Sequence, residues 1–286
     1  MLAVSQPVAV HPLAAPAIVD AFARAERAVL DAEAAAAALA AKNARPPAAA
    51  PVPEEPPPKP YRIEERVAVV PLSGTILARR TACMKKYPAM FDVAACDEFS
   101  AAVRAASLDP DADMIALDVD SPGGQVRGVP EAAGAVLAAR ELKPVCAFTA
   151  GACCSAAYWI AAQANAVFAS PSASVGSIGV FMAFLDTSRK MENEGLRVEL
   201  FSTGKYKGAG VTGSLTEAQR EHFQAEVLEI FDEFRAALAP RGIPEEAMQG
   251  QTFSGRRAAA ARLIDGFALT PLQAARTLAA LTATDN

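Results

Sequence analysis

From residue 61 onward, short apolar runs alternate with longer segments whose apolar residues recur at helical spacing. Apolar runs bounded by Gly, Pro or Asp indicate buried strands, and a period of three to four residues indicates helices with one buried face. The predicted strands are 67–72, 114–119, 145–149, 167–169, one entered from the loop 174–180, and 196–201. The predicted helices are 91–106, 129–142, one opening at Ser155, and 215–238. This alternation predicts an α/β domain with a mostly parallel sheet covered on both sides.

The last of these helices has the clearest pattern. Ser214 and Glu217 have the spacing of a capping box, which places the start of the helix beside them. One apolar face follows, formed by Phe223, Val227, Ile230, Phe231, Phe234 and Leu238. Such a face predicts packing against the domain core.

The first 60 residues have a different composition. Segment 17–42 has helical spacing and becomes an alanine run after Leu30, and 46–60 is rich in proline. An alanine-rich helix buries little area, so we favour a solvent-exposed helix over one that docks on a partner. We therefore expect two parts: an extension at 1–60, built of an Ala-rich helix and a semi-rigid Pro-rich linker, and a folded domain at 61–286.

One long stretch, 144–185, contains no charged residue and by length alone matches a membrane span. It is rich in alanine, however, and is interrupted by Gln163, Asn165 and Pro171. A buried strand–helix–strand unit accounts for it better. We expect no membrane anchor.

Charge and cysteine usage narrow the function further. The net charge is −5, so no basic field favours nucleic acid as a partner. The five cysteines are odd in number and form no C-x-x-C pair, and there are only two histidines. These counts support neither a disulfide framework nor a metal site, and they fit a reducing compartment. We predict no metal and no cofactor.

Ser155 is the candidate nucleophile. It follows the apolar run 145–149 and opens a helical pattern through Tyr158 and Trp159. A serine at a strand-to-helix turn has its hydroxyl at the top of a sheet, beside the free N–H groups of a helix N-terminus. A simple N-cap serine is the alternative. Cys153 and Cys154 are rival nucleophiles, which we interpret as small core residues because no histidine accompanies them.

The serine needs a base, and the histidines do not supply one. His11 lies in the proline-bearing N-terminal segment, and His222 lies on the outer face of the long predicted helix. A neutral lysine is the other option. Lys205 and Lys207 occupy a Gly-rich loop directly after a predicted strand, where active-site groups tend to collect, although an ordinary surface turn has the same composition.

The loop Asp-Ser-Pro-Gly-Gly at 120–124 follows another predicted strand. Gly123 and Gly124 offer backbone N–H groups that no side chain shields, which suits an oxyanion hole. A plain strand–helix turn is again the alternative, because Pro-Gly is common in turns.

Four motifs occur together and in order: Asp-Ser-Pro-Gly-Gly at 120–124, Ser-Ala-Ala-Tyr-Trp-Ile-Ala at 155–161, Gly-Ser-Ile-Gly-Val at 176–180, and Gly-Lys-Tyr-Lys at 204–207. This series resembles the signal peptide peptidase A family of serine proteases, from about residue 67 to 266. The resemblance implies a ClpP/crotonase-like fold of ββα units and a Ser–Lys dyad. Ser155 then matches the nucleophile, Lys207 the general base, Ser177 the serine that orients the lysine, and Gly124 an oxyanion-hole donor.

Three positions depart from the family pattern. Arg262 stands where the family usually has Gly, Asn165 where Asp is usual, and Gly208 where Asp is frequent. We interpret the first two departures as structural. The third concerns how Lys207 is held rather than its identity as the base.

The resemblance is closest to the phage branch of the family, the head or capsid assembly proteases. It implies a serine endopeptidase that cleaves scaffold or capsid polypeptides in the host cytoplasm or prohead. It also implies a homo-oligomeric ring in which the lysine of one subunit reaches the serine of the next. The alternatives are a cytoplasmic peptidase that degrades signal peptides or protein fragments, and an inactive homologue that acts as a scaffold or adaptor. A crotonase-like acyl-CoA enzyme is more distant, because it leaves the dyad unexplained.

Overall fold

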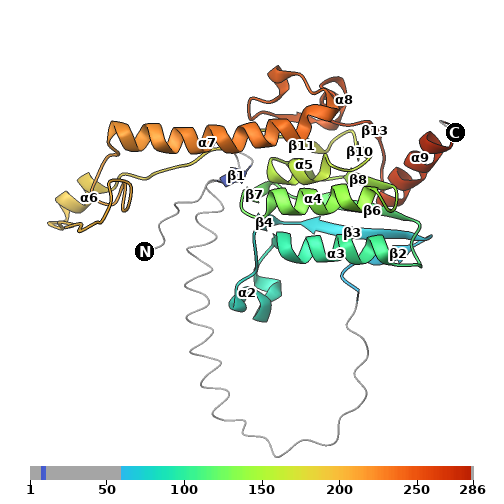
Figure 1. Ribbon diagram of the computed structural model, residues 1–286, viewed down its shortest axis with the longest axis horizontal. Coiled ribbons are helices and arrows are strands. Elements are labelled where there is room, and N and C mark those ends of the chain that lie inside the picture. Colours follow the sequence, from blue (N-terminus) through green and yellow to red (C-terminus); the bar gives the residue numbers. More distant parts are fainter. Residues whose placement is uncertain (1–7, 11–58, 285–286) are drawn as a thin grey trace, which may run out of the picture.

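The computed structural model describes residues 8–10 and 59–284, which form three sheets and the helices around them (Figure 1). The six-stranded sheet has the spatial order β13 (Gly266–Phe267), β10 (Ala166–Ala169), β8 (Val145–Thr149), β6 (Met114–Asp120), β3 (Val67–Ser73) and β2 (Arg62–Glu64). The four-stranded sheet has the order β1 (Val8–Val10), β7 (Gly123–Gln125), β4 (Thr75–Leu77) and β5 (Val93–Ala95). The three-stranded sheet has the order β12 (Thr252–Ser254), β11 (Ser174–Gly176) and β9 (Ala152–Cys154).

The helices follow the strands in a repeated ββα order. They are α2 (Ala82–Lys86), α3 (Cys96–Leu108), α4 (Val129–Arg140), α5 (Ala156–Ala161), α6 (Ser188–Asn193), α7 (Glu217–Leu238), α8 (Gly255–Ala260) and α9 (Pro271–Thr284). Strands β3, β6 and β8 each lie in the large sheet, and β4, β7 and β9 follow them in the smaller sheets before α3, α4 and α5. The predicted α/β fold of ββα units is therefore confirmed.

Two layers of helices bury the large sheet. The core beneath α3, α4 and α5 includes Val103, Val136 and Ile160, none of which is exposed. On the opposite face, α9 packs Ala274 and Leu278 against the sheet. The central strands β3, β6, β8 and β10 pair in parallel, and their continuous apolar runs match a sheet covered on both sides.

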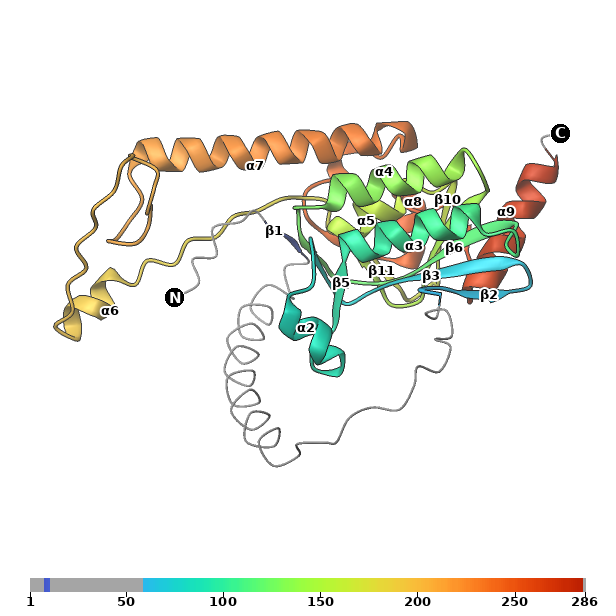
Figure 2. The same cartoon turned by 60° about the horizontal axis from the view of Figure 1, so that its bottom comes forward.

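One part of the chain leaves this body. We call residues 181–216 the arm; they include α6 and lead into the first turn of α7. Figures 1 and 2 show the arm reaching away from the sheets, joined to them by the length of α7. Of the residues of α7, only Phe234 and Leu238, near its C-terminal end, are buried in this chain. The predicted apolar face of the helix is thus fully buried at one end only, and its residues toward the arm are partly exposed.

Several sequence predictions need correction. Residues 196–201 form no strand, because nothing in the described chain pairs with them, and the loop 174–180 leads into no strand beyond β11. The capping box at the start of α7 is Thr216 with Gln219. Ser214 instead donates a hydrogen bond to Asp186 Oδ2 at 2.7 Å. The first turn of the helix predicted at 91–106 is partly β5, and α3 begins at Cys96.

The predicted helix at 17–42 and all but the end of the predicted linker at 46–60 lie outside the described residues, so the two-part organisation at residue 60 stays a prediction.

Two departures from the family pattern have clear structural consequences. Arg262 has φ of 60°, in the left-handed region where glycine is the easiest residue to place. Asn165 Oδ1 accepts the Val145 N–H at 2.8 Å. Within the described part of the chain, no helix has the length and apolar character needed to cross a bilayer.

Candidate active site

Ser155 occupies a sharp turn between β9 and α5. Its backbone has φ of 54° and ψ of −121°, a conformation that a residue with a Cβ rarely adopts. The turn is held on both sides: the Ser155 N–H donates to the Gly176 oxygen at 2.7 Å, and its oxygen accepts from the Trp159 N–H at 3.0 Å. Strain of this kind in a non-glycine residue persists where the surrounding structure imposes it, and it clusters at functional sites.

The hydroxyl of Ser155 is not used as a helix cap. Ser155 is the N-cap residue of α5, yet its side chain makes no capping hydrogen bond. The residue is fully buried, and among the described residues its Oγ has no hydrogen-bond partner. A buried hydroxyl without a partner is unfavourable for folding, so the N-cap interpretation fails to account for it.

Ser177 lies beside Ser155. Strands β9 and β11 are parallel, with Cys154 of β9 opposite Gly176 of β11. Ser155 directly follows β9, and Ser177 directly follows β11. Neighbouring strands are about 4.8 Å apart, which places the two serines side by side at the same sheet end. Ser177 is 3% exposed and also has a positive φ, 52°. The structure thus brings together two of the predicted site residues.

The Asp-Ser-Pro-Gly-Gly loop at 120–124 is hydrogen-bonded to the strand that precedes Ser155. Ser121 donates its N–H to the Ala152 oxygen at 2.7 Å and accepts from the Cys154 N–H at 3.2 Å, which joins this loop to the strand ending at Ser155. Gly124 follows in β7, and a Cβ there would lie 2.0 Å from the Ile76 oxygen. Only glycine therefore fits at position 124, because its backbone lies directly against Ile76 of β4.

Sequence reasoning missed how this loop is fixed. Asp120 Oδ1 accepts the Ala152 N–H at 2.9 Å, so the first residue of the Asp-Ser-Pro-Gly-Gly motif clamps the Gly-rich loop to β9. The signal that could have revealed this role is an aspartate directly before a Gly-rich loop. The helix after Ser155 is fixed as well: Tyr158 donates to the Leu263 oxygen at 2.8 Å, and Trp159 stacks on Phe234 with centroids 4.5 Å apart.

The rival cysteines are buried and protonated. Cys153 is 1% exposed and Cys154 has no exposed surface. Burial raises the pKa of Cys154 to about 12 and raises the pKa of Cys153 as well. A thiol with so high a pKa supplies almost no thiolate near neutral pH, so neither residue competes with Ser155 as nucleophile.

Lys207 is not near Ser155 within one chain. It lies on the arm, exposed to solvent. The neighbouring Lys205 oxygen accepts from Gln219 Nε2 at 2.5 Å, at the first turn of α7, whereas Trp159 stacks on Phe234 near its other end. With a rise of 1.5 Å per residue, Gln219 and Phe234 are about 22 Å apart along the helix. The single chain therefore presents the nucleophile and the predicted base at opposite ends of α7.

His222 belongs to the arm end of α7 too. Its ring stacks on Tyr206 with centroids 4.3 Å apart, and Nε2 lies 3.5 Å from Glu226. As expected from the sequence, it lies away from the core on a partly exposed face. It therefore lies beside the lysine loop, at the other end of α7 from Phe234.

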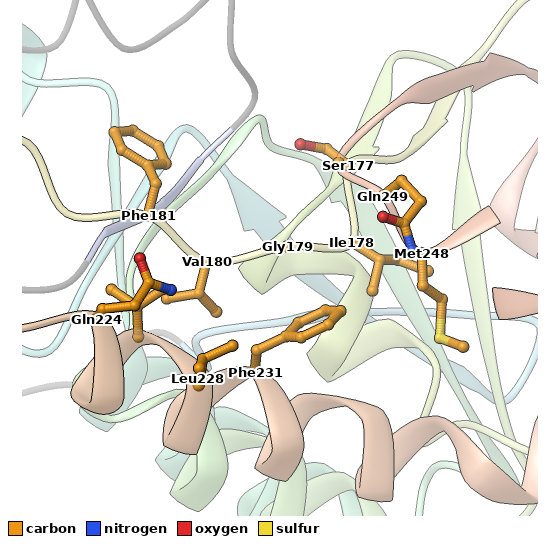
Figure 3. A pocket seen from close by; sticks show the side chains of 12 residues that line it. Ser177, Ile178, Gly179, Val180, Phe181, Gln224, Leu228, Phe231, Met248 and Gln249 are labelled. Atoms are coloured by element: carbon orange, nitrogen blue, oxygen red, sulfur yellow. The ribbon is translucent and has the colours of Figure 1, made fainter. Parts of the chain in front are cut away.

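A pocket of about 330 Å³ opens beside Ser177, between α7 and segment 177–181 (Figure 3). Leu228 and Phe231 project from α7 toward this segment, whereas the Ser177 hydroxyl points away from Phe231. The apolar lining is completed by Ile178, Val180 and Met248. The pocket therefore suits an apolar side chain next to the serine pair.

A buried serine on a strained turn, with a second serine at the end of the neighbouring strand, fits a site of the serine-hydrolase type. The chain belongs to peptidase family S49, whose model matches residues 138–283. That stretch contains Ser155, Ser177 and Lys207; Gly124 precedes it. The resemblance to the signal peptide peptidase A family is thereby confirmed.

Three relatives show how far the similarity extends. Capsid assembly protease C of Escherichia phage lambda is 33% identical over 150 residues, which cover 52% of this chain and 33% of the relative. Head-tail preconnector protein GP5 of Enterobacteria phage P21 is 28% identical over 217 residues, covering 73% and 42%. Protease 4 of Salmonella typhi is 30% identical over 175 residues, covering 59% and 28%. The matches thus span less than half of each relative.

Among solved structures, an enoyl-CoA hydratase/isomerase family member matches 78% of this chain and 74% of its own, with a TM-score of 0.37 and 16% identity. A likeness of that size carries no argument about function. The ββα order of the strands and helices is the stronger observation on the fold.

Proposed function

We propose that the protein is a serine endopeptidase in which Ser155 is the nucleophile and Lys207 of a neighbouring subunit is the general base. The observation that carries this proposal is the Ser155 turn, with its imposed positive φ and its buried, unpartnered Oγ. Membership of peptidase family S49 supports the reaction class. The base and the substrate rest on the arguments that follow.

In the proposed reaction, Ser155 Oγ attacks the carbonyl carbon of the scissile peptide bond while a neutral lysine amine takes the hydroxyl proton. The oxyanion that forms accepts a hydrogen bond from the Gly124 N–H. Collapse breaks the C–N bond, and the lysine returns the proton to the departing amine. Water, deprotonated by the same lysine, then hydrolyses the acyl-enzyme and restores the serine. Ser177 holds the lysine amine toward Ser155.

Lys207 comes from a second subunit in this proposal because one chain keeps it at the far end of α7. The arm has the surface of a buried interface rather than a free one. Its large apolar side chains are exposed: Phe181, Leu185, Leu196, Val198, Leu200 and Phe201, from 37% for Phe181 to 91% for Phe201. An arm of this kind is more stable when packed on another copy, and a head-to-tail contact of this type forms a ring where the rotation between subunits closes.

The subunit contact also suits the chemistry. A lysine acts as a base only when its amine is neutral, and burial among apolar groups favours the neutral form. Val180, Leu228 and Phe231 form an apolar surface beside Ser177. An arm docked along the rim of that surface carries its lysine out of water and toward the serine pair, and it leaves the pocket itself to the substrate.

The proposed substrates are scaffold or capsid polypeptides cut during phage head maturation. Two relatives support this choice by name, a capsid assembly protease and a head-tail preconnector protein. The apolar pocket favours an apolar or small side chain before the scissile bond. A peptidase that degrades signal peptides or fragments remains the second candidate, since Protease 4 of Salmonella typhi is also a relative. A catalytically inactive scaffold is the third.

The experiment is incubation of the purified protein with a candidate scaffold or capsid protein, followed by mass spectrometry of the products. A fluorophosphonate probe that labels reactive serines is applied in parallel. We expect cuts after small or apolar residues and probe adduct on Ser155 alone. A protein that neither reacts with the probe nor cuts any scaffold, casein or signal peptide is the inactive homologue.

A further inference from the structure

Strand β1 lies on the edge of β7, beside the proposed active site (Figure 1). The two strands pair antiparallel, with Val8 opposite Gln125, Ala9 opposite Gly124 and Val10 opposite Gly123. On its other side β7 pairs with β4. Within the described residues, β1 therefore covers the edge that β7 would otherwise leave open.

The C-terminal end of β1 is the end nearer Ser155. Val10 is in register with Gly123, and the Gly123 N–H donates to Ser121 Oγ at 3.1 Å. Ser121 in turn bonds to Ala152 and Cys154, the strand that ends at Ser155. The middle residue, Ala9, faces Gly124, the proposed oxyanion-hole donor.

A polypeptide substrate would need the same edge. Extended peptides bind open sheet edges by adding a strand, and main-chain hydrogen bonds supply much of the affinity. The carbonyl that Ser155 attacks has to lie against Gly124, which β1 already faces. Only one strand can pair with an edge at a time. Ser155 is also fully buried in this arrangement, so an incoming peptide has to displace something before it reaches the hydroxyl.

We propose that Val8–Val10 is a tethered peptide ligand that occupies the substrate-binding edge of β7 and competes with substrate. This inference rests on the proposed function, because it takes β7 as the edge that substrates use. A ligand on the same chain competes at an effective concentration that depends on the length and stiffness of the chain joining it to its site. Free peptide binds only to the molecules in which the edge is open, so its apparent affinity is the intrinsic affinity multiplied by the fraction of such molecules.

The test measures peptide binding without turnover, in a Ser155→Ala background. The probe is a fluorescein-labelled peptide of residues 5–14, followed by fluorescence polarisation. One variant lacks residues 1–12. Another carries Val8→Pro and Ala9→Pro; adjacent residues of a strand direct their N–H groups to opposite edges, so this pair removes at least one N–H that faces β7. The matched control carries Val4→Pro and Ser5→Pro, the same change four residues earlier.

We expect the truncated and the Val8→Pro/Ala9→Pro proteins to bind the probe at least tenfold more tightly than the full-length parent and the control. Equal affinity in all four proteins, or no binding to any, overturns the inference. Turnover of casein by the otherwise wild-type chain is recorded separately. If casein is cut normally but probe binding does not depend on β1, the inference about β1 is wrong and the proposed peptidase function stands. If probe binding depends on β1 but no casein is cut, the inference about β1 stands and the proposed peptidase function is wrong.

Discussion

The body and the arm of this chain differ in how far they bury and fix their proposed functional residues. In the body, Ser155 is fully buried and its backbone is fixed by hydrogen bonds to Gly176 and Trp159. On the arm, Lys207 is exposed, and the apolar side chains around its loop face solvent, with Phe201 91% exposed. The proposed nucleophile is held in place within one chain, whereas the surroundings of the proposed base are incomplete.

Under the proposed function, this difference indicates which half of the site would depend on assembly. Preorganisation of a nucleophile requires a strained turn held by a packed sheet, and a single chain provides that. Burial of a lysine amine requires apolar surface on all sides, and the arm lacks it here. The proposed function therefore predicts activity only where copies assemble, and variants in the body and in the arm should separate the contribution of each region.

The largest effect is expected in the body. Ser155→Ala removes the nucleophile and should lower turnover by several orders of magnitude. The fold should survive, because the lost Oγ has no partner among the described residues. Cys154→Ala is the matched control in the preceding residue and should keep its activity. Steady-state hydrolysis of a casein substrate measures both. Near-normal turnover by Ser155→Ala would place the nucleophile elsewhere.

The next effect is expected on the arm. Lys207→Arg keeps the positive charge but replaces the amine with a guanidinium that stays protonated, so activity should fall by orders of magnitude. Lys205→Arg, two residues away in the same loop, is the control and should keep its activity. The wild-type rate should rise with pH, because only the neutral amine accepts the serine proton. An active Lys207→Arg protein would contradict the dyad.

Mixing the two inactive proteins tests whether the regions meet across subunits. Ser155→Ala and Lys207→Ala should each be inactive alone. After subunit exchange, random pairing should restore about a quarter of the sites, in which an intact serine meets an intact lysine of the neighbour. Activity is measured against mixing ratio, with exchange confirmed by a tagged pull-down. No recovery at any ratio despite exchange would confine the dyad to one chain.

A smaller effect should follow from weakening the arm surface. Phe201→Ser removes the most exposed of the arm's large apolar side chains. Burying a side chain of this kind contributes about 1.5–3 kcal/mol, so self-association should weaken roughly tenfold or more. Leu108→Ser, on α3 and 74% exposed, is the control and should leave association unchanged. Analytical ultracentrifugation measures both; an equal loss in the two variants would mean that the arm has no special role.

The body was largely predictable from sequence because its signals are local. The apolar run at 145–149 is followed directly by the Ser155 helix, and strand β8 has those bounds. The Ser155 turn could be inferred for the same reason. Its position beside Ser177 depends on strand pairing between distant segments, and only the family resemblance suggested it.

Where a partner segment decides the structure, prediction from the chain alone failed. Segment 196–201 alternates apolar and polar residues like a half-buried strand, with Leu196, Val198 and Leu200 on one side. In the described chain it has no strand to pair with, so it forms none. Strand β1 is the converse: three residues without a helical or alternating context become a strand because β7 offers them an edge. Neither outcome is encoded within the segment itself.

The smallest effect concerns two aspartates, one in each region. A hydrogen bond from Lys59 at 2.5 Å holds the pKa of Asp109 at about 2, and the hydrogen bond from Ser188 at 2.6 Å does the same for Asp186 on the arm. An unfolded aspartate titrates near 3.9. Each group therefore stabilises its region above about pH 4, and this contribution is lost as the pH falls from about 4 to 2.

Replacing each aspartate with asparagine should separate the two regions. Trp159, the single tryptophan, stacks on Phe234 in the body, so its fluorescence reports unfolding there. Asp109→Asn should lower the stability of the body at neutral pH and flatten its dependence between about pH 4 and 2. Asp186→Asn should leave the Trp159 transition unchanged and speed tryptic cleavage at Arg189, because the arm loses the hydrogen bonds that Asp186 accepts. Equal shifts of the Trp159 transition in the two variants would show that arm and body unfold as one unit, and that the arm is already packed in the single chain.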